Sequence, residues 1–291
     1  MSLFQTMLFA PANDERKAKK ALNLPVDAVI LDLEDACALD EKENARKDII
    51  ELLKLPRSTK AYVRVNALTT SFFFEDMKCA ISAHVDGIVL PMVETAEDLV
   101  ITEWLVSTLE KENQIGSVSI DLIPIIETAK GVANISNILA RKGRVKRIAF
   151  GAGDFTNDTA MNWGKEGNEL LYTRSQLVIA SRAAEIEPPI DTVYVDLADL
   201  EGLEKETKHA KNIGFQGKML IHPQQINVVQ SVFRPDEEEI MNAQRIVAAF
   251  EEAEKLGSSS IRVGNQFVDY PIVYKARKTL ELVGKLKERG N

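Results

Sequence analysis

The stretch IPIIETAKGV, residues 123–132, joins a run of branched apolar residues to one acid, Glu127, and then to a helix-like sequence. A continuous apolar run of this kind is typical of a parallel strand that is buried on both faces. The acid therefore stands at the carboxyl end of a predicted strand, which is where parallel barrels collect their functional side chains. The same order of apolar run and amphipathic stretch recurs along the chain.

Eight strand–helix units follow one another. The predicted strands occupy residues 6–11, 27–35, 61–66, 86–91, 120–127, 147–154, 191–196 and 217–223. The amphipathic stretches between them fit right-handed crossover helices. Eight such units in about 250 residues predict a (β/α)8 TIM barrel. A doubly wound sheet is the alternative.

Two segments exceed a minimal barrel. Residues 155–172 are rich in Gly, Asn and Thr, and we expect them to form a loop over the strand ends. Beyond the eighth unit, a Gly/Ser hinge, a strand-like hairpin and a helix beginning near Pro271 predict a C-terminal appendage. We therefore expect a barrel domain over residues 1–256 and a C-terminal extension over residues 257–291.

Composition argues against several classes of protein. The 291-residue chain has 36 Lys and Arg against 44 Asp and Glu, and this net charge of −8 disfavours a nucleic-acid partner. No apolar run approaches the roughly 18 residues of a membrane span, and the N-terminus lacks the pattern of a signal peptide. The two cysteines, Cys37 and Cys79, form no zinc or CxxC spacing. We expect a cytoplasmic protein with no membrane partner.

Charged residues gather at the predicted strand ends. They are Asp32, Glu34 and Asp35 at the end of the second strand, Arg64 at the end of the third, Glu127 at the end of the fifth and Asp154 at the end of the sixth. Glu127 and Asp154 belong to consecutive strands, so their carboxylates can converge at the barrel mouth as a donor set that suits Mg²⁺. Taken singly, each acid could equally be a helix cap or an ion-pair partner, and Asp35 could simply pair with Arg64.

A basic cluster, ERKAKKA, follows the first predicted strand. It contains Arg16, Lys17, Lys19 and Lys20. Most runs of this kind are the solvated face of a helix. The alternative is a site for phosphate groups beside the barrel mouth. At the end of the last strand, His222 is more typical of a hydrogen-bonded structural histidine.

Taken together, several motifs resemble the citrate lyase β-subunit family, which groups with the malyl-CoA lyases and the HpcH/HpaI aldolases. They are LFAPAN, DAVILDLEDA, VRVNAL, DGIVLPMVETAEDL, IPIIETAKGV, AFGAGDF, TRSQLVIASRAA and IHPQQI. The combination of LDLED, IETA and GAGD makes the resemblance specific. It implies a TIM barrel, Mg²⁺ or Mn²⁺, CoA thioester substrates and Claisen-type cleavage or formation of a carbon–carbon bond.

Carried over by position, the resemblance implies roles for individual residues. Glu127 and Asp154 would bind the metal, Arg64 would contact thioester or acid oxygens, and Glu34 and Asp35 would lie near the metal and its waters. Lys20, with Arg16 beside it, would contact the phosphates of CoA.

Asp269, in the motif VDYP, matches an acid that such enzymes place over the active site of a neighbouring subunit. The resemblance therefore implies a homo-oligomer, either a trimer or a hexamer. Met92 departs from the family, whose members often carry Lys after the LP of the fourth strand. We expect this departure to affect the side of the pocket that binds the acid part of the substrate.

The implied substrate is a 3-hydroxyacyl thioester of CoA or of an acyl carrier, such as citryl-CoA or malyl-CoA. Cleavage would release acetyl-CoA, or a homologue, and an oxo-acid. Three alternatives stay open: a malyl-CoA-type thioesterase, a non-catalytic subunit of a citrate lyase-like complex, and an aldolase for free pyruvate-type substrates. The basic first helix and the long tail favour CoA, and the intact charged residues argue against a non-catalytic subunit.

Overall fold

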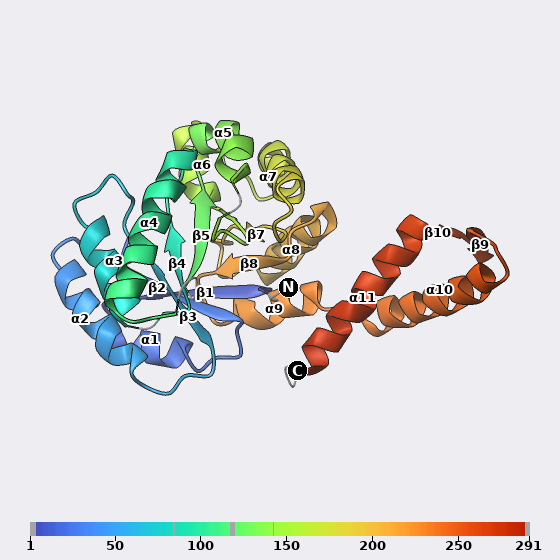
Figure 1. Cartoon of the computed structure of the whole chain (residues 1–291), viewed down its shortest axis with the longest axis horizontal. Coiled ribbons are helices and arrows are strands. Elements are labelled where there is room, and N and C mark those ends of the chain that lie inside the picture. Colours follow the sequence, from blue (N-terminus) through green and yellow to red (C-terminus); the bar gives the residue numbers. More distant parts are fainter. Residues whose placement is uncertain (1–3, 84, 117–119, 142, 289–291) are drawn as a thin grey trace. The chain divides into compact units, whose positions relative to one another are not determined.

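The computed structural model describes residues 4–83, 85–116, 120–141 and 143–288. Eight parallel strands form a closed barrel in sequential order, β1 to β8 (Figure 1). They are β1 Thr6–Pro11, β2 Ala28–Asp32, β3 Lys60–Arg64, β4 Gly87–Leu90, β5 Asp121–Ile126, β6 Ala149–Phe150, β7 Ile190–Asp191 and β8 Gly217–Leu220. The predicted (β/α)8 barrel is confirmed, and the doubly wound sheet is excluded.

The barrel strands are buried on both faces. Ala28 and Ile30 of β2 join the apolar cluster inside the barrel. Val29 and Leu31 of the same strand join the larger cluster beneath the helices. Because successive side chains of a strand point to opposite faces, covering both faces requires an unbroken apolar run. This is why the strands are recognisable in the sequence.

Helices surround the barrel (Figure 1). They are α1 Glu15–Ala21, α2 Lys42–Leu53, α3 Phe73–Ser82, α4 Ala96–Glu112, α5 Ala129–Leu139, α6 Ala152–Asp158, α7 Leu171–Ala183, α8 Leu200–Ile213 and α9 Gln225–Phe233, with a 3-10 turn, η1, at Asn168–Leu170. Across the described residues, no helix is both long enough and apolar enough to cross a membrane.

Two details differ from the sequence prediction. The expected loop over residues 155–172 is partly helical, because α6 starts directly after β6 and α7 begins at Leu171. The sixth and seventh strands are also shorter than predicted. Where a longer β6 would continue its ladder, the Ala152 N–H donates to Thr192 Oγ1 at 2.9 Å. A side chain therefore replaces the backbone acceptor, and the chain turns into a helix.

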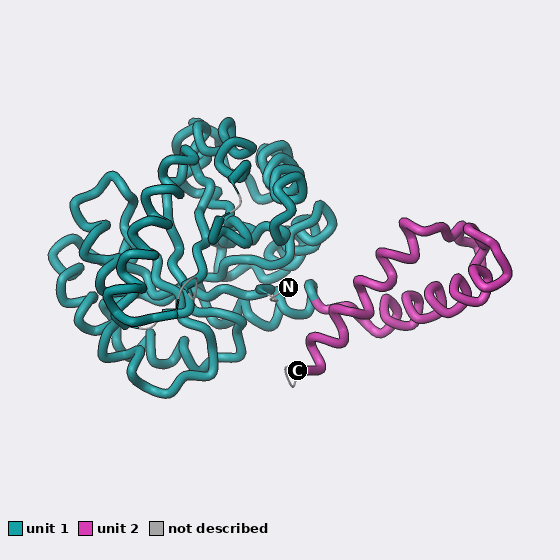
Figure 2. Tube along the Cα trace, in the orientation of Figure 1, with its two compact units in different colours: residues 1–233 teal, residues 234–291 magenta. Residues whose placement is uncertain are grey.

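The chain separates into two compact units, residues 1–233 and 234–291 (Figure 2). The second unit contains α10 Glu237–Lys255, the antiparallel hairpin of β9 Ser260–Val263 and β10 Gln266–Asp269, and α11 Tyr270–Glu288. The predicted hairpin and final helix are therefore present. The division falls earlier than the expected boundary after residue 256, because α9 follows β8 as the last helix of the barrel unit.

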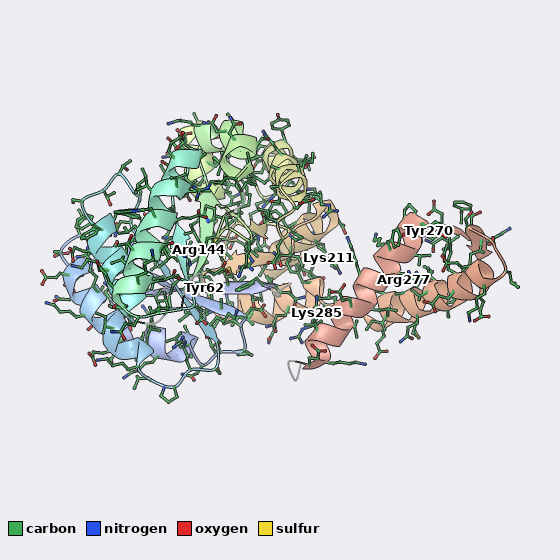
Figure 3. All side chains as sticks on the ribbon, viewed as in Figure 1. Tyr62, Arg144, Lys211, Tyr270, Arg277 and Lys285 are labelled. Atoms are coloured by element: carbon green, nitrogen blue, oxygen red, sulfur yellow. The ribbon has the colours of Figure 1, made fainter. Side chains whose placement is uncertain are left out.

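Helix α10, which lies inside the expected barrel domain of residues 1–256, packs within the second unit. Phe250 of α10 and Val273 of α11 share one buried cluster. Tyr270 and Arg277 lie along α11 (Figure 3). The Tyr270 hydroxyl donates to Glu254 at 2.9 Å, and a guanidinium nitrogen of Arg277 lies 3.2 Å from Glu251. Apolar packing and these polar contacts together join the two helices.

Candidate active site

Arg64, the last residue of β3, is held by Asp32, the last residue of β2. The two residues are paired in the strand register. Arg64 Nε and Nη2 donate to the two carboxylate oxygens of Asp32 at 2.7 and 2.6 Å. Nη1 lies 2.8 Å from a carboxylate oxygen of Glu34 and 3.2 Å from one of Asp35. The guanidinium carbon also lies 4.9 Å from the centre of the Phe9 ring.

Burial and ion pairing together set the protonation of this cluster. Burial acts to lower the pKa of Arg64, but the hydrogen bonds and charge of Asp32 outweigh it and raise that pKa, so Arg64 stays charged. Glu34 behaves differently. Burial raises its pKa to about 8, although the positive charge of Arg64 opposes this shift. Near neutral pH the Glu34 carboxyl can therefore retain a proton.

Arg64→Met should destabilise the fold by about 3–5 kcal/mol, because it leaves the Asp32 carboxylate buried without its cation. Urea unfolding measures this change. The double variant Arg64→Met with Asp32→Leu should recover part of the lost stability, because the unpaired Asp32 charge is removed while the N–H groups of Glu34 and Ala36 lose their acceptor. As a control, Lys47→Met removes an exposed pair with Glu43 and should leave the free energy of unfolding almost unchanged. Equal losses in the single and double variants would contradict this account.

Glu127 and Asp154 come together from consecutive βα units. Ile126 pairs with Phe150 in the β5–β6 register, so Glu127 faces Gly151. A Cβ at position 151 would lie 2.2 Å from Glu127 Oε2, which explains the glycine there. Asp154 is in the first turn of α6, and its charge raises the pKa of Glu127. The two side chains are therefore close enough to interact.

The backbone of Met92 holds Glu127 in place. The Met92 N–H donates to Glu127 Oε1 at 2.7 Å. Met92 has a φ of 56°, in the left-handed region that few residues other than glycine adopt. Strained backbone of this kind often marks a functional site. The family difference noted at Met92 concerns its side chain. The structure shows that its backbone N–H binds Glu127, and the identity of the side chain could not reveal this contact.

The two acids fit a divalent cation. Burial raises the pKa of Glu127 to about 7; the Met92 N–H lowers this pKa and the nearby charge of Asp154 raises it. Burial raises the pKa of Asp154 as well, and the charge of Asp35 adds to this shift. A hard cation between the two carboxyls would stabilise the ionised forms that burial and the nearby acids disfavour.

The donor set is small. Within the described part of the chain, no group of three or more His, Cys, Asp and Glu side chains is arranged to hold a metal ion. Glu127 and Asp154 could thus supply two oxygen ligands and leave the other positions to water and substrate. Mg²⁺ commonly binds proteins in this way, through one or two carboxylates.

A cavity of about 500 Å³ adjoins this cluster. It is lined by Leu8, Phe9, Ala10 and Pro11 of β1, Arg16, Lys17, Lys20 and Ala21 of α1, Leu24, and Ile221, His222 and Pro223 after β8. Phe9 belongs both to the cavity wall and to the contact with Arg64, so the cavity and the acids are neighbours. Lys19 instead pairs with Glu15 at 2.6 Å. Three members of the basic cluster, Arg16, Lys17 and Lys20, thus line the cavity and are also exposed to solvent.

His222 is hydrogen-bonded, as expected of a structural histidine, and it also lines this cavity. Its Nδ1 accepts a hydrogen bond from the Gln224 N–H at 3.2 Å.

Cys37 and Cys79 are both free and buried. Burial raises the pKa of both thiols, that of Cys79 to about 12, which disfavours the nucleophilic thiolate.

Asp269 is the last residue of β10 and belongs to the second unit. One of its carboxylate oxygens accepts a hydrogen bond from the Ile272 N–H at 3.4 Å. This is the contact of a helix-capping residue at the start of α11. The cap accounts for an aspartate at this position and leaves the catalytic role of Asp269 as a prediction.

The barrel and its charged mouth define the class of the protein. Residues 5–223 match the family model for HpcH/HpaI aldolase/citrate lyase. The chain belongs to this family and is an enzyme of the lyase class.

Its relatives match over nearly their whole length. Citrate lyase subunit beta of Leuconostoc mesenteroides subsp. cremoris is 39% identical over 282 residues, covering 96% of this chain and 93% of that protein. A (3S)-malyl-CoA thioesterase of Cereibacter sphaeroides is 34% identical over 283 residues, covering 95% and 93%. The solved structure of CitE from Mycobacterium tuberculosis in complex with magnesium, acetoacetate and coenzyme A is 27% identical. It has a TM-score of 0.80 and covers 97% of this chain and 99% of that one.

Proposed function

We propose that this protein is a Mg²⁺-dependent lyase that cleaves a carbon–carbon bond of a 3-hydroxyacyl-CoA thioester such as citryl-CoA or malyl-CoA. The products are acetyl-CoA, or a homologue, and an oxo-acid. The observation that carries the proposal is the pairing of the buried Glu127 carboxyl with the solvent-exposed Asp154 carboxyl beside Arg64 at the barrel mouth. The magnesium and coenzyme A of the M. tuberculosis structure support it by similarity.

Glu127 and Asp154 would hold the Mg²⁺, and Mn²⁺ has the same preference for oxygen ligands. When bound, the ion polarises the hydroxyl and carboxylate oxygens of the substrate. Glu34 and Asp35 lie beside these ligands, since both carboxyls contact Arg64 and Asp35 affects the pKa of Glu127. Their place suits hydrogen bonding to the water molecules around the metal.

Arg64 is suited to bind the thioester oxygen, where negative charge develops as the carbon–carbon bond breaks. Its guanidinium cannot lose its proton under working conditions. Asp32 occupies Nε and Nη2 and so fixes the orientation of the group. A fixed cation stabilises developing charge without having to reorganise during the reaction.

The enolate that forms needs a proton on carbon, and the reverse condensation needs a base at the same atom. Asp269 of a neighbouring subunit is the proposed donor and acceptor. This role requires a homo-oligomer, a trimer or a hexamer, in which the second unit of one copy reaches the site of the next. Sedimentation should show such an oligomer in the active protein. An active monomer would contradict both the assembly and this role for Asp269.

The basic cavity is the proposed site for the phosphates of CoA. Lys20→Ala should raise KM for an acyl-CoA substrate about tenfold, because a hydrogen bond to a charged phosphate is lost. The turnover number should change little, since Lys20 would bind substrate and transition state equally. Lys19→Ala on the same helix is the matched control, because Lys19 pairs with Glu15 and does not line the cavity. Equal KM values for the two variants would place the phosphates elsewhere.

A thioesterase is the second candidate function, favoured by the 34% identity to the malyl-CoA thioesterase. The discriminating experiment incubates the protein with Mg²⁺ and citryl-CoA or malyl-CoA and measures oxo-acid and free thiol separately. A lyase produces oxaloacetate or glyoxylate and no thiol, whereas a thioesterase releases the thiol and the intact hydroxy acid. Activity on acyl-carrier thioesters alone would indicate a subunit of a citrate lyase-like complex. The absence of all these products would refute an enzyme acting on such thioesters.

A further inference from the structure

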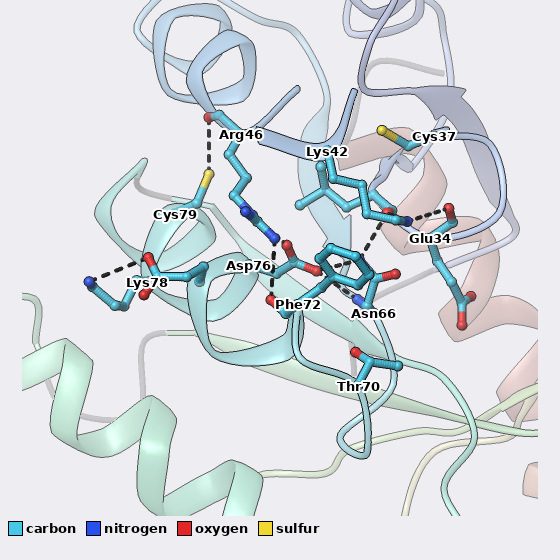
Figure 4. Close-up of polar contacts among 12 residues, drawn as sticks. Glu34, Cys37, Lys42, Arg46, Asn66, Thr70, Phe72, Asp76, Lys78 and Cys79 are labelled. Atoms are coloured by element: carbon cyan, nitrogen blue, oxygen red, sulfur yellow. Dashed lines mark hydrogen bonds and ion pairs between the residues drawn. The ribbon is translucent and has the colours of Figure 1, made fainter. Parts of the chain in front are cut away.

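Behind the acids that follow β2 lies a buried cation that the proposed chemistry does not use. Lys42, the first residue of α2, is 3% exposed. Its Nζ donates to the backbone carbonyl oxygens of Leu33 and Glu34 at 2.6 and 2.9 Å (Figure 4). It also lies 5.4 Å from the centre of the Phe72 ring. Within the described residues, no carboxylate forms an ion pair with this ammonium group.

This is a costly place for a lysine. Burying an ammonium group without a carboxylate partner is unfavourable. The dipole of α2 adds to the cost, because the amino end of a helix disfavours a cation. A methionine of similar length would fill the space without either penalty. Packing alone therefore does not explain why a lysine occupies position 42. Its hydrogen bonds to the two carbonyl groups do explain it.

Those carbonyls belong to the turn after β2, residues 33–37, which carries Glu34. On the other side of this turn, the N–H groups of Glu34 and Ala36 donate to the carboxylate of Asp32 at 3.0 and 3.1 Å. Asp32 thus holds the amides and Lys42 holds the carbonyls. With its peptide groups fixed from both sides, the turn directs the Glu34 side chain to Arg64, 2.8 Å away.

A second set of contacts supports the first. Asn66 Nδ2 donates to the Leu33 carbonyl at 3.0 Å and to Asp76 Oδ2 at 2.6 Å. The other oxygen of the fully buried Asp76 accepts from Arg46 Nε at 2.7 Å (Figure 4). Arg46 and Lys42 are four residues apart, one turn of α2, so one face of this helix supplies both cations. The turn is therefore tied to α2 directly through Lys42 and indirectly through Arg46.

We propose that Lys42 is a positioning residue that directs Glu34 toward Arg64 by fixing the carbonyl groups of the turn after β2. The inference rests on the proposed lyase function, which gives Glu34 and Arg64 their places in the active site. Without the ammonium group, the peptide groups of the turn can rotate, and Glu34 loses its fixed contact with Arg64. A displacement of this size is enough to slow a preorganised reaction.

The kinetic test uses the full-length protein, Mg²⁺ and whichever acyl-CoA thioester the wild type cleaves. Lys42→Met should lower kcat about 10–100-fold and leave KM within about twofold. Glu34→Gln should also lower kcat, and the double variant should be no slower than the slower single variant, because both changes remove one function. If the double variant lost kcat by the product of the two single-variant factors, the proposal would be overturned. A wild-type kcat in Lys42→Met would overturn it as well. Lys47→Met, an exposed lysine on the same helix, is the control and should keep the wild-type kcat.

Hydrogen exchange provides a readout that does not depend on activity. In Lys42→Met the amides of Glu34 and Ala36 should exchange about tenfold faster than in the wild type, with no change in Lys47→Met. Lys42→Gln keeps an amide donor without the buried charge, so it serves if Lys42→Met does not fold, and it should show a smaller increase. If the wild type cleaves no thioester, the proposed function is wrong, and exchange still decides the positioning role. Unchanged exchange at both amides would refute that role.

Discussion

Glu127→Gln is expected to abolish Mg²⁺ binding and to lower turnover about a thousandfold, the effect of losing several kcal/mol of electrostatic stabilisation by the metal. The carboxamide lacks the negative charge that a hard cation requires. Its shape is nearly that of the acid, so the hydrogen bond from the Met92 N–H can be kept. The fold should therefore survive, and the loss should be specific to the metal and the reaction.

The same substitution should stabilise the metal-free protein at about pH 8. The pKa of Glu127 is raised by burial from its ordinary value of 4.5 to about 7. A carboxyl with a raised pKa contributes stability that is present below the unfolded pKa and is lost as the pH rises through the folded value. Above that range the wild type carries an unfavourable buried charge, whereas glutamine is neutral at every pH. The melting temperature of the variant should thus exceed that of the wild type without metal.

Calorimetric titration with Mg²⁺ and thermal melts with and without the ion measure both effects. Glu94→Gln is the matched control. Glu94 lies near the end of β4 and pairs with Lys130 at 2.9 Å. The control substitution therefore makes the same carboxylate-to-amide change at a residue other than Glu127 and Asp154. The control should bind Mg²⁺ as the wild type does. An unchanged Mg²⁺ affinity in Glu127→Gln would remove the metal site from this position.

Asp269→Asn is expected to reduce turnover about 10²–10⁴-fold, the usual loss when a general acid–base is removed. Binding of Mg²⁺ and CoA should be largely retained, because the residue belongs to the second unit and is not among the proposed ligands. The capping contact with the Ile272 N–H predicts the competing outcome. If Asp269 is only a cap, its loss costs about 1 kcal/mol of stability and little activity. Turnover and melting temperature measured on the same variant separate the two roles.

Mixing experiments test where Asp269 acts. Subunits carrying Asp269→Asn and subunits carrying Glu127→Gln should both be inactive alone. If Asp269 serves a neighbouring site, mixed oligomers contain some sites with an intact Glu127 from one subunit and an intact Asp269 from another, and activity returns. No recovery in oligomers shown to be mixed would place the residue in its own subunit's site or outside the reaction.

The barrel was predictable because parallel strands covered on both faces need unbroken apolar sequence. The division after Phe233 was not predictable in this way. Helix α10 is amphipathic like any barrel helix, and amphipathicity shows that a face is buried without showing its partner. Phe250 packs against α11 and α9 directly follows β8, and both are facts of three-dimensional packing.

The candidate site was partly predictable. Glu127, Asp154, Glu34, Asp35 and Arg64 follow strands, and closing a parallel barrel brings strand ends to one mouth. Contacts made by main-chain atoms could not be predicted, because they do not depend on which side chain a residue carries. The Met92 N–H on Glu127 and the carbonyls bound by Lys42 are of this kind. Nothing in the sequence distinguishes Lys42 from the other charged residues around it.

The barrel, its charged mouth and the family can be recognised from residue order, because they depend on side-chain polarity at regular intervals and on motifs in order. Which charges are buried, and what they contact, depends on the packing of the folded chain. It pairs Asp32 with Arg64, and it raises the pKa of Glu127 and Glu34. Desolvation and hydrogen bonding depend on atoms brought close in space from distant parts of the chain, so residue order does not reveal them. That environment converts a row of acids at strand ends into a candidate metal site with a fixed cation beside it.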